Sequence, residues 1–179
     1  YGIALDDELN IYVTDSRNLP EYHDLTKYRV QIFNNQGSFL REIGSGGRGN
    51  GAFRLPRGVA VDLKGNVYVA DTYNSRIQVF SSSGAFLHKF RVYSKDNKVD
   101  YWPRKITVDK NGIIYVSNYN QVHMYSNTGE HLRFFGSWGD SDGKFIEITG
   151  LAVDQTGKIF VLDGEKNNVQ VFTNKGVFI

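Results

Sequence analysis

Short apolar runs recur along the whole chain, separated by turns that contain Gly, Asn and Asp. The run at residues 58–62 (GVAVD) has counterparts at residues 2–6, 105–109 and 150–154. Short runs rich in Val, Ile and Tyr favour strands, and the 3.6-residue period of an amphipathic helix is absent. The pattern therefore predicts four copies of one all-β unit.

Each copy continues with three more predicted strands. The second strands lie at 10–15, 66–71, 113–118 and 158–163, the third at 29–33, 76–80, 121–125 and 168–172, and the fourth at 39–43, 86–90, 131–135 and 177–179. A unit of about 45 residues with four short strands is typical of a propeller blade. We therefore expect one all-β propeller segment over residues 1–179 with sixteen strands, in four-stranded antiparallel blades at about 1–57, 58–104, 105–149 and 150–179.

Two local features refine this prediction. The second strands are almost continuously apolar, as expected when neighbouring blades bury both faces of a sheet. Turns such as Asp62-Leu63-Lys64-Gly65 combine an Asp that accepts backbone N–H bonds with a Gly that adopts positive φ. The first copy has Leu9 where the others have Gly, so its turn is expected to differ.

Composition narrows the class further. Of the 179 residues, 40% are apolar and 22% charged, which is typical of a globular chain, and the 14% aromatic content favours strands. A formal charge of +2 is too small to indicate nucleic-acid or membrane binding by itself. The lack of cysteine excludes disulfides and thiolate metal sites, and no apolar run reaches the roughly 20 residues that span a bilayer, so we expect no membrane insertion.

The stretch at residues 56–87 (PRGVAVDLKGNVYVADTYNSRIQVFSSSGAFL) resembles the NHL repeat, and weaker copies cover essentially all of the chain. It joins a Pro-x-Gly start, an AVD turn, a YVAD strand end and an NSRIQVF third strand, whereas the Gly-His and Trp-Asp marks of WD repeats are missing. The resemblance implies a propeller, usually of six blades. Many prokaryotic arrays of this kind are exported or surface-bound, and with no Asn-x-Ser/Thr site in the chain this favours an extracellular or cell-surface location of prokaryotic type.

Two copies depart from the repeat. The third has Ser117 and Asn118 in place of Ala-Asp and lacks the Arg of the third strand, and the fourth starts with Ile148 and Thr149 in place of Pro-Arg. The resemblance therefore defines the strands of these blades better than their loops.

Four blades sized for a six-bladed ring would leave open sheet edges and apolar blade faces in water. Further blades of the polypeptide, a second chain, or closure into a four-bladed ring would each solve this problem. Because both ends of the sequence fall inside the repeat pattern without a polar cap, we expect further blades, so that the sequence is part of a longer chain.

The loops after the second and fourth strands are expected on one face of a propeller, and they vary most among the copies. They carry the candidate partner-binding residues Arg48, Arg54, Arg57, Tyr73, Arg76, Tyr101, Trp102, Arg104, Tyr119 and Trp138. Rings and Arg dominate protein interfaces, so a protein partner is the first hypothesis. RNA binding through the Arg-, Lys- and Tyr-rich loops of blades one and two is the alternative, because cations neutralise phosphates and rings stack on bases. The resemblance implies it too, since some propellers of this kind in tripartite-motif ubiquitin ligases bind RNA. Acidic residues in the same loops weigh against RNA.

Structure alone can explain part of this set. Arginines that recur at equivalent blade positions are expected to pair within the fold, and these are Arg57, Arg76 and Arg104. Their expected partners are the strand-end aspartates Asp15, Asp71 and Asp163, or the neighbouring blade. The rings at non-equivalent loop positions are better candidates for function, and these are Tyr73, Trp102, Tyr119 and Trp138.

An enzyme is the third hypothesis, since the resemblance extends to six-bladed hydrolases and lyases that hold a metal near the channel mouth. The four histidines, His23, His88, His123 and His131, fall on different strands and loops, so we expect them not to converge on one ion. We therefore predict no catalytic residue, metal or cofactor. The Gly-rich residues 44–51 precede no helix and are interpreted as a flexible connection, and residues 140–143 (DSDG) as a solvated turn rather than a calcium loop.

Overall fold

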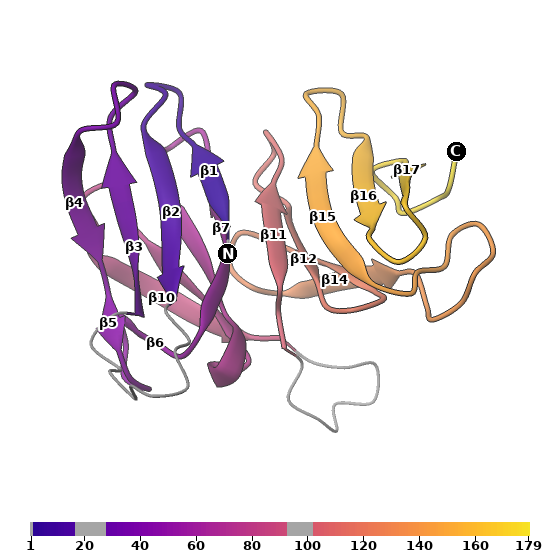
Figure 1. The fold of residues 1–179 in the computed structure, drawn as a ribbon, viewed down its shortest axis with the longest axis horizontal. Helices are drawn as coiled ribbons and strands as arrows, with labels where there is room; N and C mark the ends of the chain where they lie inside the picture. The colour runs from indigo at the N-terminus through magenta and orange to yellow at the C-terminus, as the bar shows by residue number, and fades with distance from the viewer. Residues whose placement is uncertain (1, 17–27, 93–101) are drawn as a thin grey trace. The chain divides into compact units, whose positions relative to one another are not determined.

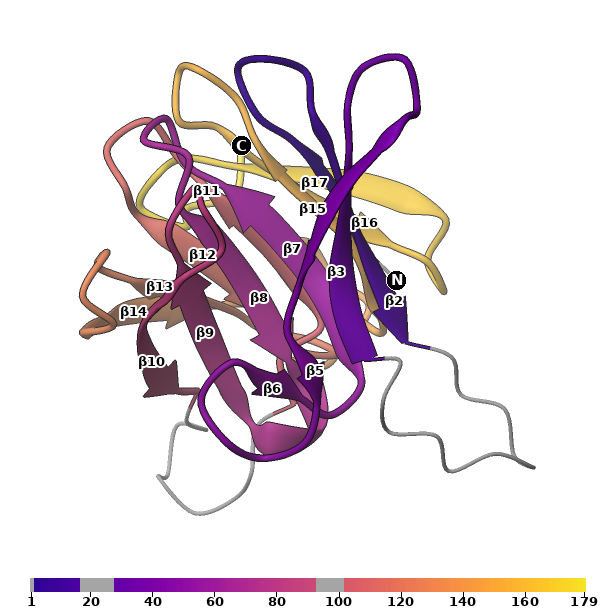
Figure 2. The same cartoon turned by 90° about the vertical axis from the view of Figure 1, so that its left-hand side faces the viewer.

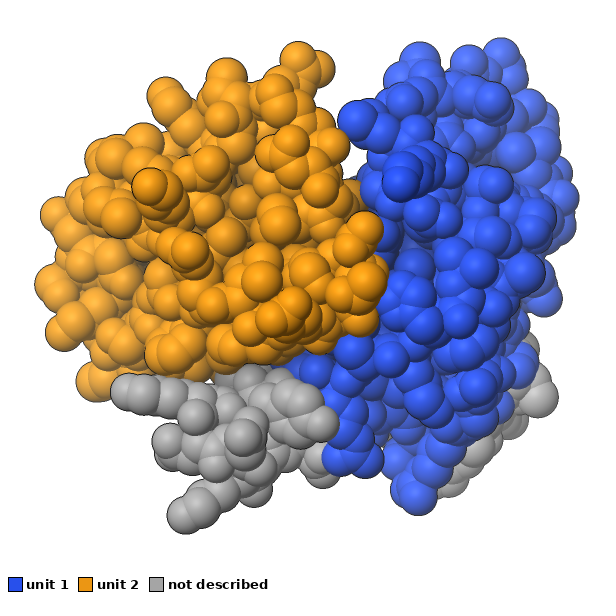
Figure 3. Space-filling model, turned by 180° about the vertical axis from the view of Figure 1, so that it is seen from behind, with its two compact units in different colours: residues 1–103 blue, residues 104–179 orange. Residues whose placement is uncertain are grey.

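The computed structural model describes residues 2–16, 28–92 and 102–179 of the chain. The chain divides into two compact units, unit 1 (Tyr1–Pro103) and unit 2 (Arg104–Ile179), which Figure 3 shows in blue and orange. Each unit contains two antiparallel blades whose strands are neighbours in sequence (Figure 1). Consecutive strands of the chain pair with each other in every blade, which confirms the predicted all-β propeller class.

Unit 1 contains the first two blades. The first consists of β1 (Ile3–Leu5), β2 (Ile11–Ser16), β3 (Tyr28–Phe33) and β4 (Phe39–Ile43). The second consists of β7 (Pro56–Val61), β8 (Val67–Asp71), β9 (Arg76–Phe80) and β10 (Phe86–Arg91), with the 3-10 helix η2 (Thr72–Asn74) between β8 and β9. Between the blades, β5 (Ser45–Gly46) pairs in parallel with β6 (Ala52–Phe53). Sequence reasoning had not predicted this pair.

Unit 2 contains the third and fourth blades. The third consists of β11 (Lys105–Val108), β12 (Ile114–Ser117), β13 (Val122–Tyr125) and β14 (His131–Phe135). The fourth is a three-stranded sheet of β15 (Ile148–Val153), β16 (Ile159–Asp163) and β17 (Asn168–Phe172). The strand predicted at 177–179 is only begun, by an isolated bridge between Phe172 and Phe178 and a bond from Ile179 N to Val171 O of 3.0 Å.

The turns between first and second strands follow the predicted chemistry. The Oδ1 atom of Asp62 accepts the N–H groups of Lys64 (2.9 Å) and Asn66 (2.8 Å), and its Oδ2 accepts the Tyr68 hydroxyl (3.0 Å). The expectation that the first turn differs was wrong. Leu9 adopts a φ of 63°, close to the 77° of Gly65, because the Asp6 carboxylate makes the same bonds and holds the turn in the same conformation.

Apolar side chains between the two blades of each unit form the cores. In unit 1, Tyr12, Val30 and Ile32 of the first blade lie in one buried cluster with Val67 and Val69 of the second. Alternate residues of a strand point to opposite faces of its sheet, so each blade offers one face to each neighbour. Burial of these faces is what holds the two blades of a unit together.

Continuous burial of the second strands is found in only two blades. Every residue of β8 and of β12 is buried, as predicted. In contrast, β2 alternates between half-buried and buried residues, and Leu162 of β16 is exposed between the buried Val161 and Asp163. The first and fourth blades therefore each have one sheet face that the described residues leave open. Within those same residues there is no helix of the length and apolar character needed to cross a membrane.

Candidate functional site

Loop 44–58 connects the two blades of unit 1 and lies at the end where η2 joins β8 to β9 (Figures 1 and 2). It is an ordered structure, so its interpretation as a flexible connection was wrong. Gly44 has a φ of 84° and lies directly against the ring of Phe53, which is 0% exposed. Only glycine fits there, because a Cβ atom would overlap the ring.

Buried polar side chains hold this loop, and we call Asp71, Asn74, Arg76 and Gln78 the Asp71 network. The Asp71 carboxylate is 0% exposed and accepts bonds from Arg54 N (2.6 Å), Asn74 Nδ2 (2.8 Å), Arg76 Nε (2.7 Å) and Gln78 Nε2 (3.1 Å). Burial raises the pKa of Asp71 above its usual value, and these donors act in the opposite direction. The predicted pair of Arg76 with Asp71 is thus confirmed.

The same network reaches the loop backbone. Arg76 donates to the carbonyl oxygens of Arg48 (3.0 Å), Gly49 (2.7 Å) and Ala52 (2.7 Å), and Gln78 bonds Gly51 N (2.9 Å) as well as Ala52 O (2.7 Å). Donors that satisfy several carbonyls at once fix the backbone around the short β5–β6 pair. Arg76 is therefore a structural residue, and its guanidinium is not available to a partner.

The other arginines of the loop behave differently. Arg48 is exposed and Arg54 and Arg57 are half-buried, and none of the three side chains forms an ion pair within the described part of the chain. The predicted pairing of Arg57 with Asp15 was wrong, because Arg29 takes that place at 3.2 Å. Loop 44–58 thus has three unpaired cations and no carboxylate.

Two of the predicted rings meet beside this loop. The centroids of Tyr73 and Trp102 lie 5.6 Å apart at a tilt of 49°, and the side chains are 46% and 49% exposed. Tyr73 N donates to Arg54 O (2.9 Å), and the Thr72 hydroxyl donates to Pro103 O (2.7 Å), so both rings are tied to the loop end of unit 1. Tyr101 lies outside the described residues.

Loop 136–150 of unit 2 repeats the architecture with different side chains. Gly136 has a φ of 85° against the ring of the buried Phe145, and Trp138 forms a parallel bridge with Phe145. Gln170 bonds Gly143 N (2.7 Å) and Lys144 O (2.8 Å), as Gln78 does in unit 1. The position of Arg76 is taken by Asn168, which is exposed.

Backbone donors replace the arginine in unit 2. Asp163 accepts the N–H groups of Ile146 (2.7 Å), Glu147 (3.1 Å), Glu165 (3.2 Å) and Lys166 (3.2 Å). Burial alone would raise the pKa of Asp163, but these four donors lower it below the usual value. The predicted pairing of Asp163 with an arginine was therefore wrong.

Arg104 is held inside unit 2. Its Nη1 lies 2.7 Å from Glu147 Oε1, and its guanidinium carbon lies 4.2 Å from the centroid of the Tyr119 ring. Tyr119 is 46% exposed, and its carbonyl accepts Ile148 N (2.6 Å). Arg104 and Tyr119 thus brace loop 136–150, and the outer face of the Tyr119 ring is the part left to a partner.

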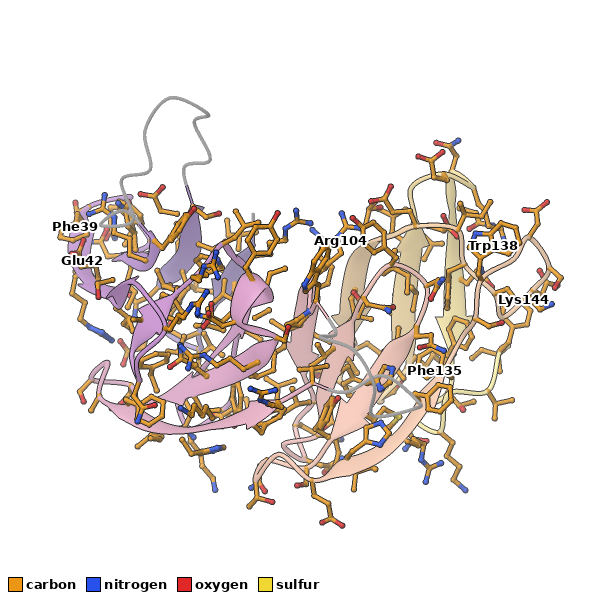
Figure 4. The ribbon with its side chains drawn as sticks, turned by 90° about the horizontal axis from the view of Figure 1, so that it is seen from below. Phe39, Glu42, Arg104, Phe135, Trp138 and Lys144 are labelled. Carbon is orange, nitrogen blue, oxygen red and sulfur yellow. The ribbon has the colours of Figure 1, made fainter. Side chains whose placement is uncertain are left out.

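Trp138 is the most exposed of the predicted rings that the structure describes, at 72%. Figure 4 shows it with Lys144 on the same loop, away from Arg104. Asp140 and Asp142 are exposed on that loop and form no ion pair within the described ranges. With three carboxylates and one lysine, loop 136–150 has a formal charge of −2, against +3 for loop 44–58 with its three arginines.

The similarity of the two loops was not predicted from the sequence. Their sequences, GSGGRGNGAFRLPRG and GSWGDSDGKFIEITG, share Gly, Ser, Gly, Gly, Phe and Gly in register. The missed signal was this spacing of glycines before a phenylalanine.

Two of the four histidines lie next to each other. His123 Nδ1 lies 3.1 Å from His131 Nε2, because β13 and β14 pair and bring the two rings together. Burial and the charge of His131 lower the pKa of the buried His123 to about 4. Within residues 2–16, 28–92 and 102–179, which do not include His23, no three His, Asp or Glu side chains are grouped to bind a metal ion.

The fold and these repeated loop networks define a β-propeller built from one recurring blade type. The family model of the NHL repeat matches residues 53–80 and 145–172, which contain both Asp networks. The chain therefore carries NHL repeats at these two positions and folds as a β-propeller.

Curated proteins with similar sequence include the E3 ubiquitin-protein ligase TRIM71 of Gallus gallus, 50% identical over 44 residues, and protein lin-41 of Caenorhabditis elegans, 42% identical over 45 residues. Each match covers 25% of this chain but only 5% and 4% of those proteins. The chain thus corresponds to a small part of these relatives.

Solved structures with a similar fold include virginiamycin B lyase of Staphylococcus aureus, with a TM-score of 0.68 at 15% identity over 100% of this chain and 54% of that one. A gluconolactonase of Xanthomonas campestris has a TM-score of 0.63 at 19% identity over 90% of this chain and 53% of its own. The chain spans about half the length of these enzymes, and at such identity the likeness shows the fold alone.

Proposed function

We propose that this chain is a non-enzymatic binding scaffold in which each unit docks protein through its own loop, 44–58 in unit 1 and 136–150 in unit 2, and the rings beside that loop. The observation that carries the proposal is that, for each loop, one set of side chains holds the backbone and another set faces solvent. Buried polar side chains hold the backbone, whereas Arg48 and Trp138 point outward without a partner among the described residues.

A rigid loop lowers the cost of binding because little conformational freedom is lost on docking. The residues presented are of the kinds that dominate interfaces, namely Trp, Tyr and Arg. In TRIM71 of Gallus gallus the matched segment is 5% of an E3 ubiquitin-protein ligase, which agrees with a recognition module inside a larger protein.

Opposite loop charges favour a protein over a nucleic acid. Phosphate backbones would be attracted to the cations of loop 44–58 but repelled by Asp140 and Asp142 of loop 136–150. A protein partner can match positive and negative patches alike, as interfaces commonly do.

RNA binding by unit 1 alone is the second candidate. It is supported by the three unpaired arginines of loop 44–58 and by the exposed ring pair of Tyr73 and Trp102. Unpaired bases stack on such rings at about 1–3 kcal/mol per base.

One experiment separates these candidates. A phage-displayed random peptide library is selected on the wild-type chain, on Trp138→Ala and on Arg48→Ala, with Lys175→Ala in an exposed turn as the control. In parallel, a labelled oligouridine is titrated across a salt series.

A protein-docking face enriches a peptide consensus whose affinity falls at least about tenfold in Trp138→Ala or Arg48→Ala and is unchanged in Lys175→Ala. Tight oligouridine binding that weakens steeply with salt and is lost in Arg48→Ala, with no peptide consensus, would overturn the proposal in favour of RNA.

A further inference from the structure

The edge strand of the second blade, β10, carries two exposed cations, Lys89 and Arg91. They are two residues apart, so their side chains point to the same face of the sheet. In the register of β9 with β10 they lie opposite Gln78 and Arg76, respectively, whose side chains bond the backbone of loop 44–58. Directly opposed residues share a face, so both cations lie on the face of the blade that holds this loop.

Arg48 of the loop continues this basic surface. Lys89 Nζ donates to Asn50 Oδ1 (2.8 Å), two residues after Arg48, so strand and loop are in contact there. Arg48 is exposed and, like Lys89 and Arg91, forms no ion pair within residues 2–16, 28–92 and 102–179. We call Arg48, Lys89 and Arg91 the basic strip of unit 1.

The described carboxylates of unit 1 do not neutralise the basic strip. Asp71 is buried against Arg76, and Asp15 and Glu42 are both paired with Arg29. The other described carboxylates of the unit lie in turns at the opposite end of its two blades (Figure 1), and these are Asp6, Asp7, Glu8 and Asp62. The basic strip therefore presents positive charge that only a partner can match among the groups described.

The conformation of the loop does not depend on Arg48. The equivalent residue of loop 136–150 is the exposed Asp140, on a loop with the same glycine, phenylalanine and glutamine contacts. Two residues of opposite charge thus occupy one position of the same backbone plan. Exposed charges of this kind serve electrostatic complementarity with a partner.

We propose that the protein segment which unit 1 docks is acidic, with its carboxylates facing the basic strip. This inference rests on the function proposed above and adds the chemistry of the partner. Lys89 and Arg91 lie about 7 Å apart along β10, and acidic residues at alternate positions of an extended segment have the same spacing. Tyr73 and Trp102, the exposed ring pair beside the loop, contact apolar side chains of that segment.

Peptides enriched from the displayed library on the wild-type chain test the inference. Each is assayed on Arg48→Asp, on Lys89→Gln and on the control Lys64→Asp, whose exposed cation lies in the turn at the other end of the same blade. Loop 136–150 naturally carries Asp at the position of Arg48, and Gln keeps an N–H donor toward Asn50. Circular dichroism and melting temperature therefore stay those of wild type.

A neutral substitution assigns the peptides to unit 1, so that the assignment does not itself select for charge. Unit 1 peptides lose affinity in Tyr73→Ala but not in Trp138→Ala. We expect them to contain more Asp and Glu than the unselected library and to bind more weakly as salt rises. Their affinity should fall at least about tenfold in Arg48→Asp and about threefold in Lys89→Gln, and stay unchanged in Lys64→Asp.

The other outcomes separate this inference from the proposed function. Unit 1 peptides without an excess of Asp and Glu, or with full affinity for Arg48→Asp, overturn the inference and leave the proposed function standing. The same holds if every enriched peptide depends on Trp138 alone. If no peptide depends on either loop, or if only oligouridine binds and is lost in Arg48→Asp, the proposed function fails and the inference fails with it.

Discussion

Loops 44–58 and 136–150 have the same backbone plan but different stabilising groups. Both place a glycine of positive φ on a buried phenylalanine and both use a glutamine, Gln78 or Gln170, to bond the loop backbone. In unit 1 a buried arginine links the aspartate to three carbonyls, whereas in unit 2 the aspartate binds backbone N–H groups directly.

This difference shows how one repeat supports two surfaces of opposite charge. The residues that fix the backbone lie on β8, η2, β9, β16 and β17, and the residues that face solvent lie within the loops. Because the two groups are separate, the loop surface can change from arginines to carboxylates without loss of the loop conformation.

The largest loss of stability is expected when Arg76 is replaced. Arg76→Met should lower the free energy of unfolding by about 4 kcal/mol, because it leaves the Asp71 carboxylate buried without its cation. Asn168→Met at the equivalent exposed position should change it by less than about 0.5 kcal/mol. Urea unfolding measures both, and equal effects would contradict the distinction between the loops.

The glycines shared by both loops should matter equally. Gly44→Ala and Gly136→Ala each combine a positive φ with a Cβ overlapping a phenylalanine ring, and we expect each to cost about 3 kcal/mol. Gly37→Ala, with a φ of 79° but open space around it, is the matched control for the backbone term. If thermal unfolding shows clearly different losses of stability for Gly44→Ala and Gly136→Ala, the two loops do not share one backbone plan.

Lowering the pH should remove the stability that the ionised Asp163 carboxylate of unit 2 contributes. Asp163→Asn should cost about 2 kcal/mol at neutral pH, since bonds to an ionised acceptor are lost. Because donors hold the pKa of Asp163 below its unfolded value of 3.8, its contribution is complete above that pH and is lost as the pH falls through the lower folded value. The gap between wild type and variant, measured by urea unfolding, should therefore narrow in acid. A gap that widens would refute the assignment.

The smallest effect concerns two equivalent turn positions. Ser75 and Asn167 have φ values of 51° and 52°. Glycine relieves this strain, and the gain should be about 1 kcal/mol for Ser75→Gly but only a few tenths for Asn167→Gly, because Asn tolerates the left-handed region better. Melting temperatures of the two variants provide the comparison.

The positions of the strands were predicted correctly from the sequence, but the conformations of the loops were not. Period and turn residues located every strand of the first three blades, because strand pairing is between neighbours in the chain. It misjudged Leu9, since the Asp6 bonds that stabilise its φ also form without glycine. It also interpreted residues 44–51 as flexible, since the groups that hold them, Arg76 and Gln78, lie well over twenty residues away.

For the candidate site residues, the exposure of the side chains was predicted better than their ion-pair and hydrogen-bond partners. Tyr73, Trp102, Tyr119 and Trp138 are all exposed, as loop positions indicated. The partner of each arginine could not be deduced, because a guanidinium reaches groups on other strands and loops. Whether these residues bind a partner stays a prediction.

The sequence by itself determined a recurring four-stranded unit, its turn chemistry and its blade type, because these depend on contacts between residues close in the chain. Tertiary structure alone decided that Arg76 is buried while Arg48 has no ion pair among the described residues, and that loops 44–58 and 136–150 share one backbone plan. These properties depend on which groups fold back onto each other across long separations, and no local pattern records that.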